Sequence, residues 1–490
     1  MTNDRGVGLK GWLTGPRTKQ SETKPIPESP TSLDKRRIAV LPFVSMSADP
    51  QDEFFADGLT EELIDRLCQA QELEVIARTS VMVFKKKEKK AADIGRELMA
   101  GALVEGSVRK AGNKIRVTAQ LIDANTEAHL WSSRYDRDLE DIFAVQSSIA
   151  RQVAEALTVK LLPDERKAIE KKATGSMQAY TLYLKGRYYW NERTENSVKR
   201  GIEYLKLALE EDPNFANAYS DLADCYVIMA DYGMIEGKEA YSLVSKYAGA
   251  ALERDAKLSQ PHAALGITFE RNFKWADSEL EFQRAIELNP NNSTAHHWYA
   301  LNVWFRNRVE QAIREWRRAK NLDPLSLIIS CALGTALAFA RQEQEGFDML
   351  KQAIEINDRF PVLHRNIAFC YIKSGRMLEA ATEADRLVAL DAGLGYNAHA
   401  AWVYAKAGRK KDALQILDQL VTKMNQHYVD PAIIAMIYAS LGDETRTFEW
   451  LETAVAKRSS GLAYVNMLPA FDAMRDNPRF KGMMQSVGLQ

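Results

Sequence analysis

The sequence has no excess of charge of either sign, which is unusual for a nucleic-acid-binding protein. Its 490 residues include 65 Lys and Arg against 66 Asp and Glu, a net charge of −1. Nucleic-acid binders usually carry a basic excess, so we expect no nucleic-acid partner. The one dense basic run, Lys85 to Lys90, is typical of a solvated loop.

Cysteine and long apolar runs are also scarce. The four cysteines form no CxxC pair, so we expect reduced thiols, mostly in the core. The longest uncharged stretch, residues 324–340, is shorter than the roughly 18–20 apolar residues of a membrane span. Residues 1–36 contain no apolar segment of a signal peptide. We therefore expect a cytoplasmic protein without a membrane span; the alternative is the periplasmic side of a membrane protein whose native start lies upstream.

Motifs for catalysis and cofactor binding are missing or out of context. Gly6–Gly11 matches the letters of the dinucleotide-binding motif GxGxxG. That motif binds phosphate only when it follows a strand and begins a helix, and no strand is expected before Gly6. GxxxxGK[ST] and HExxH are absent. Adjacent His296 and His297 would point about 100° apart on a helix, a poor chelate, so we expect polar packing there. The sequence predicts no catalytic residue, no metal and no cofactor, and hence a protein that is not an enzyme.

The N-terminal third reads as a leader followed by an α/β domain. Residues 1–36 are rich in Gly, Pro, Ser, Thr and Lys and predict a disordered leader or linker. Residues 37–162 predict a mixed sheet of about five strands, the last three forming a meander. Asp57–Glu62 is expected near a helix start, as a cap and turn or, alternatively, as a ligand loop. The expected strands are 38–44, 73–77, 104–108, 115–121 and 128–132, and the expected helices are 53–70, 91–99 and 139–161.

Beyond residue 174 the sequence repeats with a period of 34 residues. Four columns of small or polar residues keep this step, which is typical of stacked helix pairs. Small residues let two helices approach closely, and Pro290 and Pro324 follow helix ends because proline cannot continue a helix. We expect about seven to eight repeats over residues 174–456 and a capping segment over 457–490. The columns are Ala251, Ala285, Ala319 and Ala353; Asp255, Asn289, Asp323, Asn357 and Asp391; Gly266, Ala300, Gly334 and Ala368; and Ser278, Ala312, Gly346 and Ala380.

The segments Ala208–Pro213, Ala285–Pro290 and Ala319–Pro324 resemble the second-helix ending of the tetratricopeptide repeat (TPR) family. The resemblance implies an all-α TPR superhelical solenoid, whose first helices line a concave groove for a protein or peptide. A basic clamp for a carboxylate is not evident, because the central positions are mainly apolar. The partner is therefore expected to be apolar or amphipathic, and the groove aromatics partly exposed. The alternative is that these side chains pack within the array. The groove positions are Leu301, Trp304, Phe305, Thr335, Phe339, Arg365, Phe369, Ile372 and Lys373.

The α/β region also resembles a family. Ile38–Phe43, Phe55–Leu63, Val104–Arg109 and Tyr135–Arg137 look like the TolB amino-terminal (FlgO-like) domain. In bacterial signalling proteins this domain is followed by TPRs and is often preceded by a nucleotide cyclase, a winged-helix domain or a kinase. The 36 residues ahead of it here are too few for such a module.

Two functions follow from these resemblances. The first is a scaffold or sensor adaptor for protein–protein interaction, with the partner in the concave TPR groove. The alternative is a regulatory subunit acting in trans in nucleotide-cyclase or transcriptional signalling, with a ligand or partner site on the α/β domain.

Overall fold

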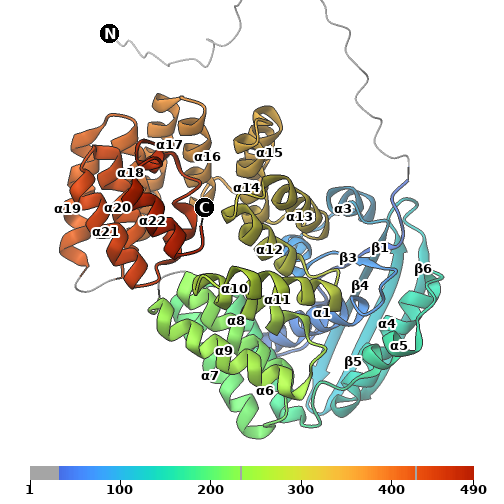
Figure 1. Ribbon diagram of the computed structural model, residues 1–490. Coiled ribbons are helices and arrows are strands. Elements are labelled where there is room, and N and C mark those ends of the chain that lie inside the picture. The colour runs from blue at the N-terminus through green and yellow to red at the C-terminus, as the bar shows by residue number, and fades with distance from the viewer. Residues whose placement is uncertain (1–31, 232–233, 425–427, 490) are drawn as a thin grey trace, which may run out of the picture. The chain divides into compact units, whose positions relative to one another are not determined.

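The N-terminal part of the protein, described here from a computed structural model, is built around one mixed sheet (Figure 1). The structure describes residues 32–231, 234–424 and 428–489, so most of the expected leader and the GxGxxG match at Gly6–Gly11 lie outside it. The six strands follow the order β3–β1–β4–β5–β6, with β2 pairing with β4. β1 runs parallel to β3 and β4, and β4, β5 and β6 form an antiparallel meander, which confirms the predicted mixed sheet. The strands are β1 (Arg37–Val40), β2 (Val44–Ser45), β3 (Glu74–Val75), β4 (Ala102–Ala111), β5 (Lys114–Asp123) and β6 (His129–Asp138).

Pro42 divides the first apolar run into two strands. The Leu41 amide donates to Val104 O at 2.8 Å, and the Met46 amide donates to Val108 O at 2.8 Å. Between them Pro42 has no N–H to donate, so the ladder with β4 is interrupted and resumes at β2. The sequence had suggested one strand through this segment.

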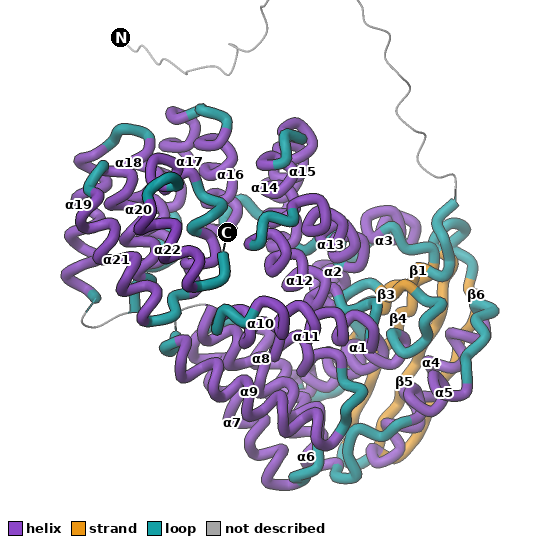
Figure 2. The backbone as a smooth tube through the Cα atoms, viewed as in Figure 1, coloured by secondary structure: helices purple, strands orange, loops and turns teal. Residues whose placement is uncertain are grey.

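Helices α1 and α4 pack against the sheet (Figure 2). The expected continuation of the last helix to residue 161 is wrong, because α4 ends at Ala156. Thr158 has φ of 58°, and the Val159 amide donates to Ala154 O at 2.9 Å, a left-handed helix ending that turns the chain away. The helices of this region are α1 (Glu53–Leu67), α2 (Arg78–Val81), α3 (Ala91–Leu98), α4 (Ile142–Ala156) and α5 (Pro163–Glu170).

Within the described residues, eight helix pairs follow the sheet region in chain order (Figure 1). This agrees with the all-α repeat array that the 34-residue period predicts. None of the described helices is both long enough and apolar enough to cross a bilayer. The pairs are α6 (Met177–Asn191) with α7 (Glu195–Glu211), α8 (Ala216–Asp231) with α9 (Gly237–Arg254), α10 (Ser259–Arg271) with α11 (Trp275–Leu288), α12 (Ser293–Phe305) with α13 (Val309–Leu322), α14 (Leu327–Phe339) with α15 (Glu343–Ile356), α16 (Pro361–Lys373) with α17 (Met377–Ala389), α18 (Leu394–Lys406) with α19 (Lys410–Lys423), and α20 (Pro431–Leu441) with α21 (Glu444–Ala456).

Most polar residues at the helix ends share one backbone geometry, whereas Asp391 has φ of 48°. Asp212, Asp255, Asn289 and Asn357 follow their helices with φ between −141° and −159°. In all four the side-chain oxygen accepts the amide two residues later, at 2.9–3.3 Å. This Asx turn explains why Asp or Asn recurs every 34 residues.

The small-residue columns lie where paired helices touch. A Cβ added at Gly346 in α15 would lie 2.5 Å from the carbonyl oxygen of Gly334 in α14, and 2.8 Å from the amide of Ala338. The partner atoms are backbone, so neither can move aside independently. Only glycine allows this separation of the two helices.

Replacing Gly346 with alanine should therefore destabilise the protein by about 1–3 kcal/mol, because the two helices must move apart. Gly249, which lies in α9 with open space around it, is the matched control. Its replacement with alanine should leave stability unchanged or raise it by up to about 1 kcal/mol, through helix propensity. Urea unfolding of both variants tests this assignment, and equal midpoints would contradict it.

Candidate functional site

Most of the predicted groove residues are buried. Trp304 is 5% exposed, Phe305 1% and Phe369 5%, and Thr335 and Ile372 are buried too. The expectation that these aromatics are partly exposed is therefore wrong for Trp304, Phe305 and Phe369. Half-buried or exposed positions remain at Leu301, Phe339, Arg365 and Lys373.

Aromatic packing within the array accounts for part of this burial. The Trp304 ring lies 5.6 Å from Trp316 and 6.2 Å from Phe339, centroid to centroid, with both contacts edge-to-face. Phe369 meets Trp402 of α18 at 4.6 Å in the same geometry. The first helices of neighbouring repeats thus meet through aromatic contacts, as the alternative sequence interpretation held.

The chain itself covers the rest of this surface. Beyond α21, a C-terminal segment, Ser459–Met474, follows an irregular path through two short 3-10 helices, η4 (Ser460–Tyr464) and η5 (Pro469–Met474). Its Tyr464 ring lies 4.8 Å from Phe305, edge-to-face. Leu468 reaches the same helices, and both side chains line a cleft there with residues of α12, α14 and α16.

Specific polar contacts hold this segment in place. Asp430, the N-cap of α20, accepts the Gly461 amide at 2.9 Å and the Ser460 hydroxyl at 3.1 Å. Lys406 donates to the carbonyl of Pro469 at 3.1 Å. After α22 (Pro478–Ser486), the Val487 carbonyl accepts the indole N–H of Trp275 in α11 at 2.7 Å. The C-terminal region is therefore part of the folded array.

A small cleft of about 70 Å³ stays open beside the segment. Leu301, Ile328 and Ala332 line its apolar side, and Ile328 is 42% exposed. Arg365 lines the other side; its Nε donates to Asn366 Oδ1 at 3.1 Å, and no carboxylate among the described residues pairs with it. Lys373, about two turns further along α16, lies over the ring of Phe339, 5.6 Å from its centroid. The open part of the groove thus has an apolar floor with Arg365 at its edge, and Lys373 lies further along the same helix.

The Asp57–Glu62 segment lies inside α1 and not at its start, so the expected cap and turn is wrong. Gly58 faces α6, where an added Cβ would lie 2.6 Å from Leu184 Cδ2. Thr60 accepts the Phe43 amide and donates to Ala56 O, both at 3.0 Å. Glu61 pairs with Arg187 of α6 at 2.6 Å. The segment is a packing surface that joins the α/β region to the first repeat.

One buried carboxylate at this contact, Glu61, is surrounded by half-buried charged groups. Glu61 is bridged by Arg187 and by Arg78 of α2. Burial alone would lower the pKa of Arg187. The nearby carboxylates of Glu61 and Asp221 have a larger, opposite effect, so the pKa lies well above its usual value. Burial raises the pKa of Asp221 to about 7, and Arg187, 3.5 Å away, opposes this. The contact depends on a carboxylate–guanidinium network that spans α1, α2, α6 and α8.

The α/β region also docks on two of the repeat ends. Asn291, which follows the Asn289 turn, donates to Leu73 O at 2.9 Å and accepts the Val75 amide at 3.4 Å, so it pairs with β3 as a neighbouring strand would. At the next repeat the Ala77 amide donates to Leu322 O at 2.8 Å.

Asp323 departs from its column at this contact. The Ser80 hydroxyl, fully buried, donates to Asp323 Oδ1 and itself accepts the Leu325 amide at 2.8 Å. In the other repeats the amide two residues after the Asp or Asn donates to that residue's own side chain. Here the corresponding amide, that of Leu325, donates to the Ser80 hydroxyl instead. Burial raises the pKa of Asp323 to about 6, despite the hydrogen bond from Ser80.

Three histidines tie the two helices of their repeats together. His262, His296 and His364 each place Nδ1 2.6–2.7 Å from a glutamate 19 residues later. For His364, the hydrogen bond to Glu383 raises the pKa. His297 instead accepts the indole N–H of Trp316 at 3.0 Å, and burial lowers its pKa to about 4. The histidine pair at 296–297 therefore serves polar packing, as expected.

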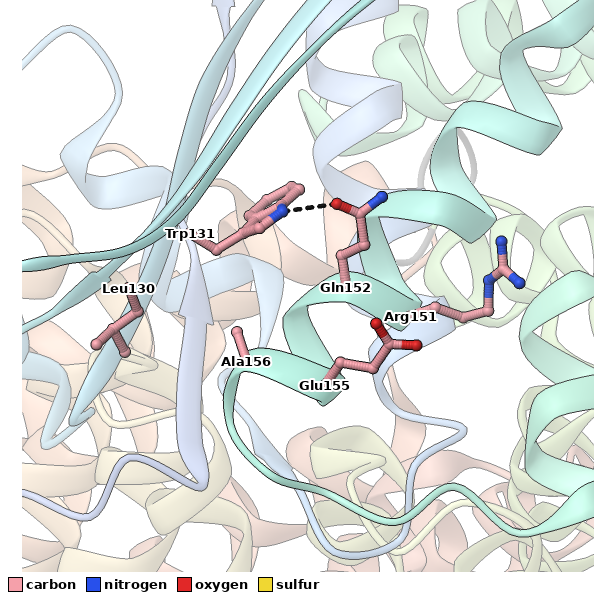
Figure 3. A pocket seen from close by; sticks show the side chains of 6 residues that line it. All are labelled: Leu130, Trp131, Arg151, Gln152, Glu155 and Ala156. Carbon is pink, nitrogen blue, oxygen red and sulfur yellow. Dashed lines mark hydrogen bonds between the residues drawn. The ribbon is translucent and has the colours of Figure 1, made fainter.

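A second, open cleft lies on the α/β region, between the start of β6 and the end of α4 (Figure 3). Its volume is about 460 Å³. Leu130 and Trp131 line one side, and the Trp131 indole donates to Gln152 Oε1 at 2.6 Å. Arg151, Gln152, Glu155 and Ala156 of α4 line the other. The cleft is both apolar and polar, and no sequence motif had indicated it.

Two curated bacterial proteins are similar to parts of this chain. "Putative adenylate cyclase 3" of Rhizobium meliloti (strain 1021) is 33% identical over 306 residues, 61% of this chain and 46% of that protein. "Transcriptional regulator HilA" of Salmonella typhimurium is 26% identical over 149 residues, 30% of this chain and 27% of HilA. The chain thus spans less than half the length of these curated relatives. No protein-family model matches it.

Solved structures with repeat arrays are similar only in part. The Cut9–Hcn1 hetero-tetramer of the APC/C is 16% identical, with 65% of this chain and 60% of that chain covered and a TM-score of 0.42. PilF of Pseudomonas aeruginosa is 18% identical, with 43% and 91% covered and a TM-score of 0.33. The TPR assignment therefore rests on this chain's own 34-residue period and its helix pairs.

Sequence reasoning missed the residues that join the two regions. Ser80, Asn291 and Arg187 carried no motif, and their roles depend on segments more than 100 residues apart. The histidine–glutamate pairs did leave a signal, since the same 19-residue offset recurs at His262, His296 and His364.

Replacing Asp323 with asparagine should stabilise the protein at pH 7. The carboxyl pKa is about 6 when folded, against a reference value of 3.8, so the parent loses stability as pH rises between about 4 and 6. Asparagine avoids this loss and still accepts the Ser80 hydrogen bond. The gain should be absent near pH 4 and reach about 2–3 kcal/mol above pH 6. Chemical unfolding across this range measures it, with the exposed column residue Asp391→Asn as control; a less stable D323N at pH 7 would contradict it.

Replacing Trp304 with alanine should cost about 3–5 kcal/mol, as for any large buried aromatic. The loss arises because its contacts with Phe305, Trp316 and Phe339 disappear together. Leu280→Ala, at a position 65% exposed, should change stability by less than about 0.5 kcal/mol. Urea midpoints compare the two. A loss under about 1 kcal/mol for W304A would mean that the groove aromatics are open in solution.

Proposed function

We propose that the protein is a scaffold or sensor adaptor for protein–protein interaction, binding an apolar or amphipathic segment of a partner at the open part of the concave TPR surface. It has no catalytic step of its own in this proposal, and it is cytoplasmic. The observation that carries the proposal is the groove beside Arg365. An apolar floor and Arg365, which has no acidic partner among the described residues, lie together there. Lys373, on the same helix, lies over Phe339, whose ring contacts Trp304 of the cleft.

The physical argument starts from the floor. Ile328, 42% exposed, and half-buried Leu301 present apolar surface to solvent at one place, where a partner's apolar side chain gains by desolvation. Arg365 is held by Asn366 and by the face of Phe369, at 5.9 Å, so its guanidinium is preorganised. A carboxylate on the partner would complete its hydrogen bonding. The buried aromatics beneath, Trp304 and Phe305, support this surface instead of binding directly.

The C-terminal segment shows what chemistry this surface accepts. Tyr464 and Leu468 already occupy part of it, in an irregular backbone conformation. A partner segment with aromatic or aliphatic side chains would therefore lie alongside the C-terminal segment and share its apolar floor.

The names of the relatives favour the alternative function, that of a regulatory subunit in a signalling system. One is named an adenylate cyclase and the other a transcriptional regulator, and the similar stretch accounts for less than half of each. A regulatory subunit that acts in trans on a cyclase or a regulator would keep the same groove and use it for that effector. The TolB-like (FlgO-like) assignment of the α/β region belongs to this proposal, and would place a second ligand or partner site there.

Reversing the charges of Arg365 and Lys373 should abolish partner capture. In Arg365→Glu with Lys373→Glu, capture of specific partners by the immobilised full chain from its native lysate should fall at least about tenfold, since both cations are lost. Mass spectrometry measures the captured proteins. Thermal melting should change little, because neither side chain makes an ion pair within the described array.

The matched control is Lys410→Glu with Lys411→Glu. These two exposed lysines begin α19, outside the groove, and give the same change in net charge. The control should capture partners as the parent does. Equal capture by both double variants would move the binding surface elsewhere, and recovery of a cyclase or transcription factor by the parent alone would favour the regulatory alternative.

A further inference from the structure

Strand β6 is a long strand at the edge of the sheet. It pairs with β5 along its length, and among the described strands none pairs with its other edge. The opposite edge, at β3, is covered by Asn291. Unpaired backbone groups of an edge strand are a template for a further strand. The pairing of β6 with β5 has one irregularity. Leu121 pairs with Trp131 and the next residue, Ile122, pairs with His129, so Leu130 has no partner in β5. From Trp131 onward the pairing is regular.

The two faces of β6 differ in chemistry. Trp131, Ser133 and Tyr135 face α4, where they hydrogen-bond to Gln152 and Ser148. On the outer face Arg134 pairs with Asp136 at 2.9 Å. Asp136 also pairs with Arg116 of β5 at 2.5 Å, and Asp138, on the same face, pairs with Lys114 of β5 at 2.6 Å. Arg134 and Asp136 are thus opposite charges separated by a single residue.

We propose that a second copy of this chain pairs with the open edge of β6. The two β6 strands run antiparallel about a two-fold axis at Tyr135, and the two sheets become one continuous sheet.

Charge sets this register. A two-fold axis perpendicular to the sheet keeps α4 of both copies on one face and centres the pairing on a single residue. When the axis lies at Tyr135, Arg134 of each copy lies opposite Asp136 of the other, so two opposite-charge pairs form. Asp138 then lies opposite the uncharged Ser132 and keeps its pair with Lys114. Centred at Arg134 or at Asp136, two like charges face each other at the axis. Centred at Ser133, the pairing would run through the irregularity at Leu130.

Charges on an edge strand usually prevent pairing, but here they are self-complementary in one register only. The edge is thus selective for its own copy instead of being closed to every strand. The same register brings Trp131 opposite Leu139 of the second copy. Both side chains are half-buried in one chain, and Trp131 lines the open cleft of Figure 3. Apolar contact at both ends of the paired segment would supplement the hydrogen bonds between the strands.

Sedimentation velocity of the full chain over about 1–50 µM tests the pairing, in a range where weak homodimers dissociate. The parent should show a concentration-dependent monomer–dimer equilibrium. Arg134→Asp alone and Asp136→Arg alone should each weaken it at least about tenfold, because each places like charges opposite one another twice. The double variant R134D/D136R should dimerise again.

Mixing the two single variants gives the sharpest result. In a dimer of one R134D chain and one D136R chain, both cross-strand pairs are again opposite in charge, so the mixture should dimerise although each variant alone does not. Folding defects cannot produce this rescue, and circular dichroism of each variant checks the fold. A parent that stays monomeric throughout, single variants that dimerise like the parent, or a mixture without rescue would each overturn the proposal.

Discussion

Every helix pair in this protein has an apolar face that only a neighbouring element can bury, and the rest of the structure follows from that constraint. Within the array, the next pair supplies the cover. At the N-terminal end of the array, the described residues before α6 form no repeat, and α1 packs there instead, with Gly58 against Leu184. At the C-terminal end α22 follows α21, and the chain returns to Trp275 in α11. The α/β region therefore acts as the first cap of the repeats.

The polar residues at the junction show how such a cap is made specific. Apolar packing alone would allow α1 to slide along α6, whereas Glu61 must meet both Arg78 and Arg187. Removing one partner would leave a buried charge without compensation, which is costly. Asp323 reinforces the same point, since its carboxylate is diverted from a local turn to Ser80. The positions that dock the α/β region are helix ends already shaped by the repeat.

The concave surface combines a structural and an exposed part. Trp304, Phe305 and Phe369 form a layer that the C-terminal segment covers, so they stabilise the array. Leu301, Ile328 and Arg365 remain at the open end of the same surface. A partner there would meet a preformed, rigid support, which lowers the entropic cost of binding.

The sequence by itself determined the mixed sheet with its meander and the repeat period, because both are local. Alternation along a strand and a 34-residue step of small residues need no knowledge of distant segments. It also placed Leu301, Phe339 and Arg365 on the first helices of their pairs, but it did not determine which side chains are exposed. Only the tertiary structure decided that Phe305 lies under Tyr464, 159 residues later, and that Gly58 faces α6 and is not in a turn. The physical reason is that burial depends on which distant segment covers a side chain, whereas the periodicity of a segment shows only that some cover is needed.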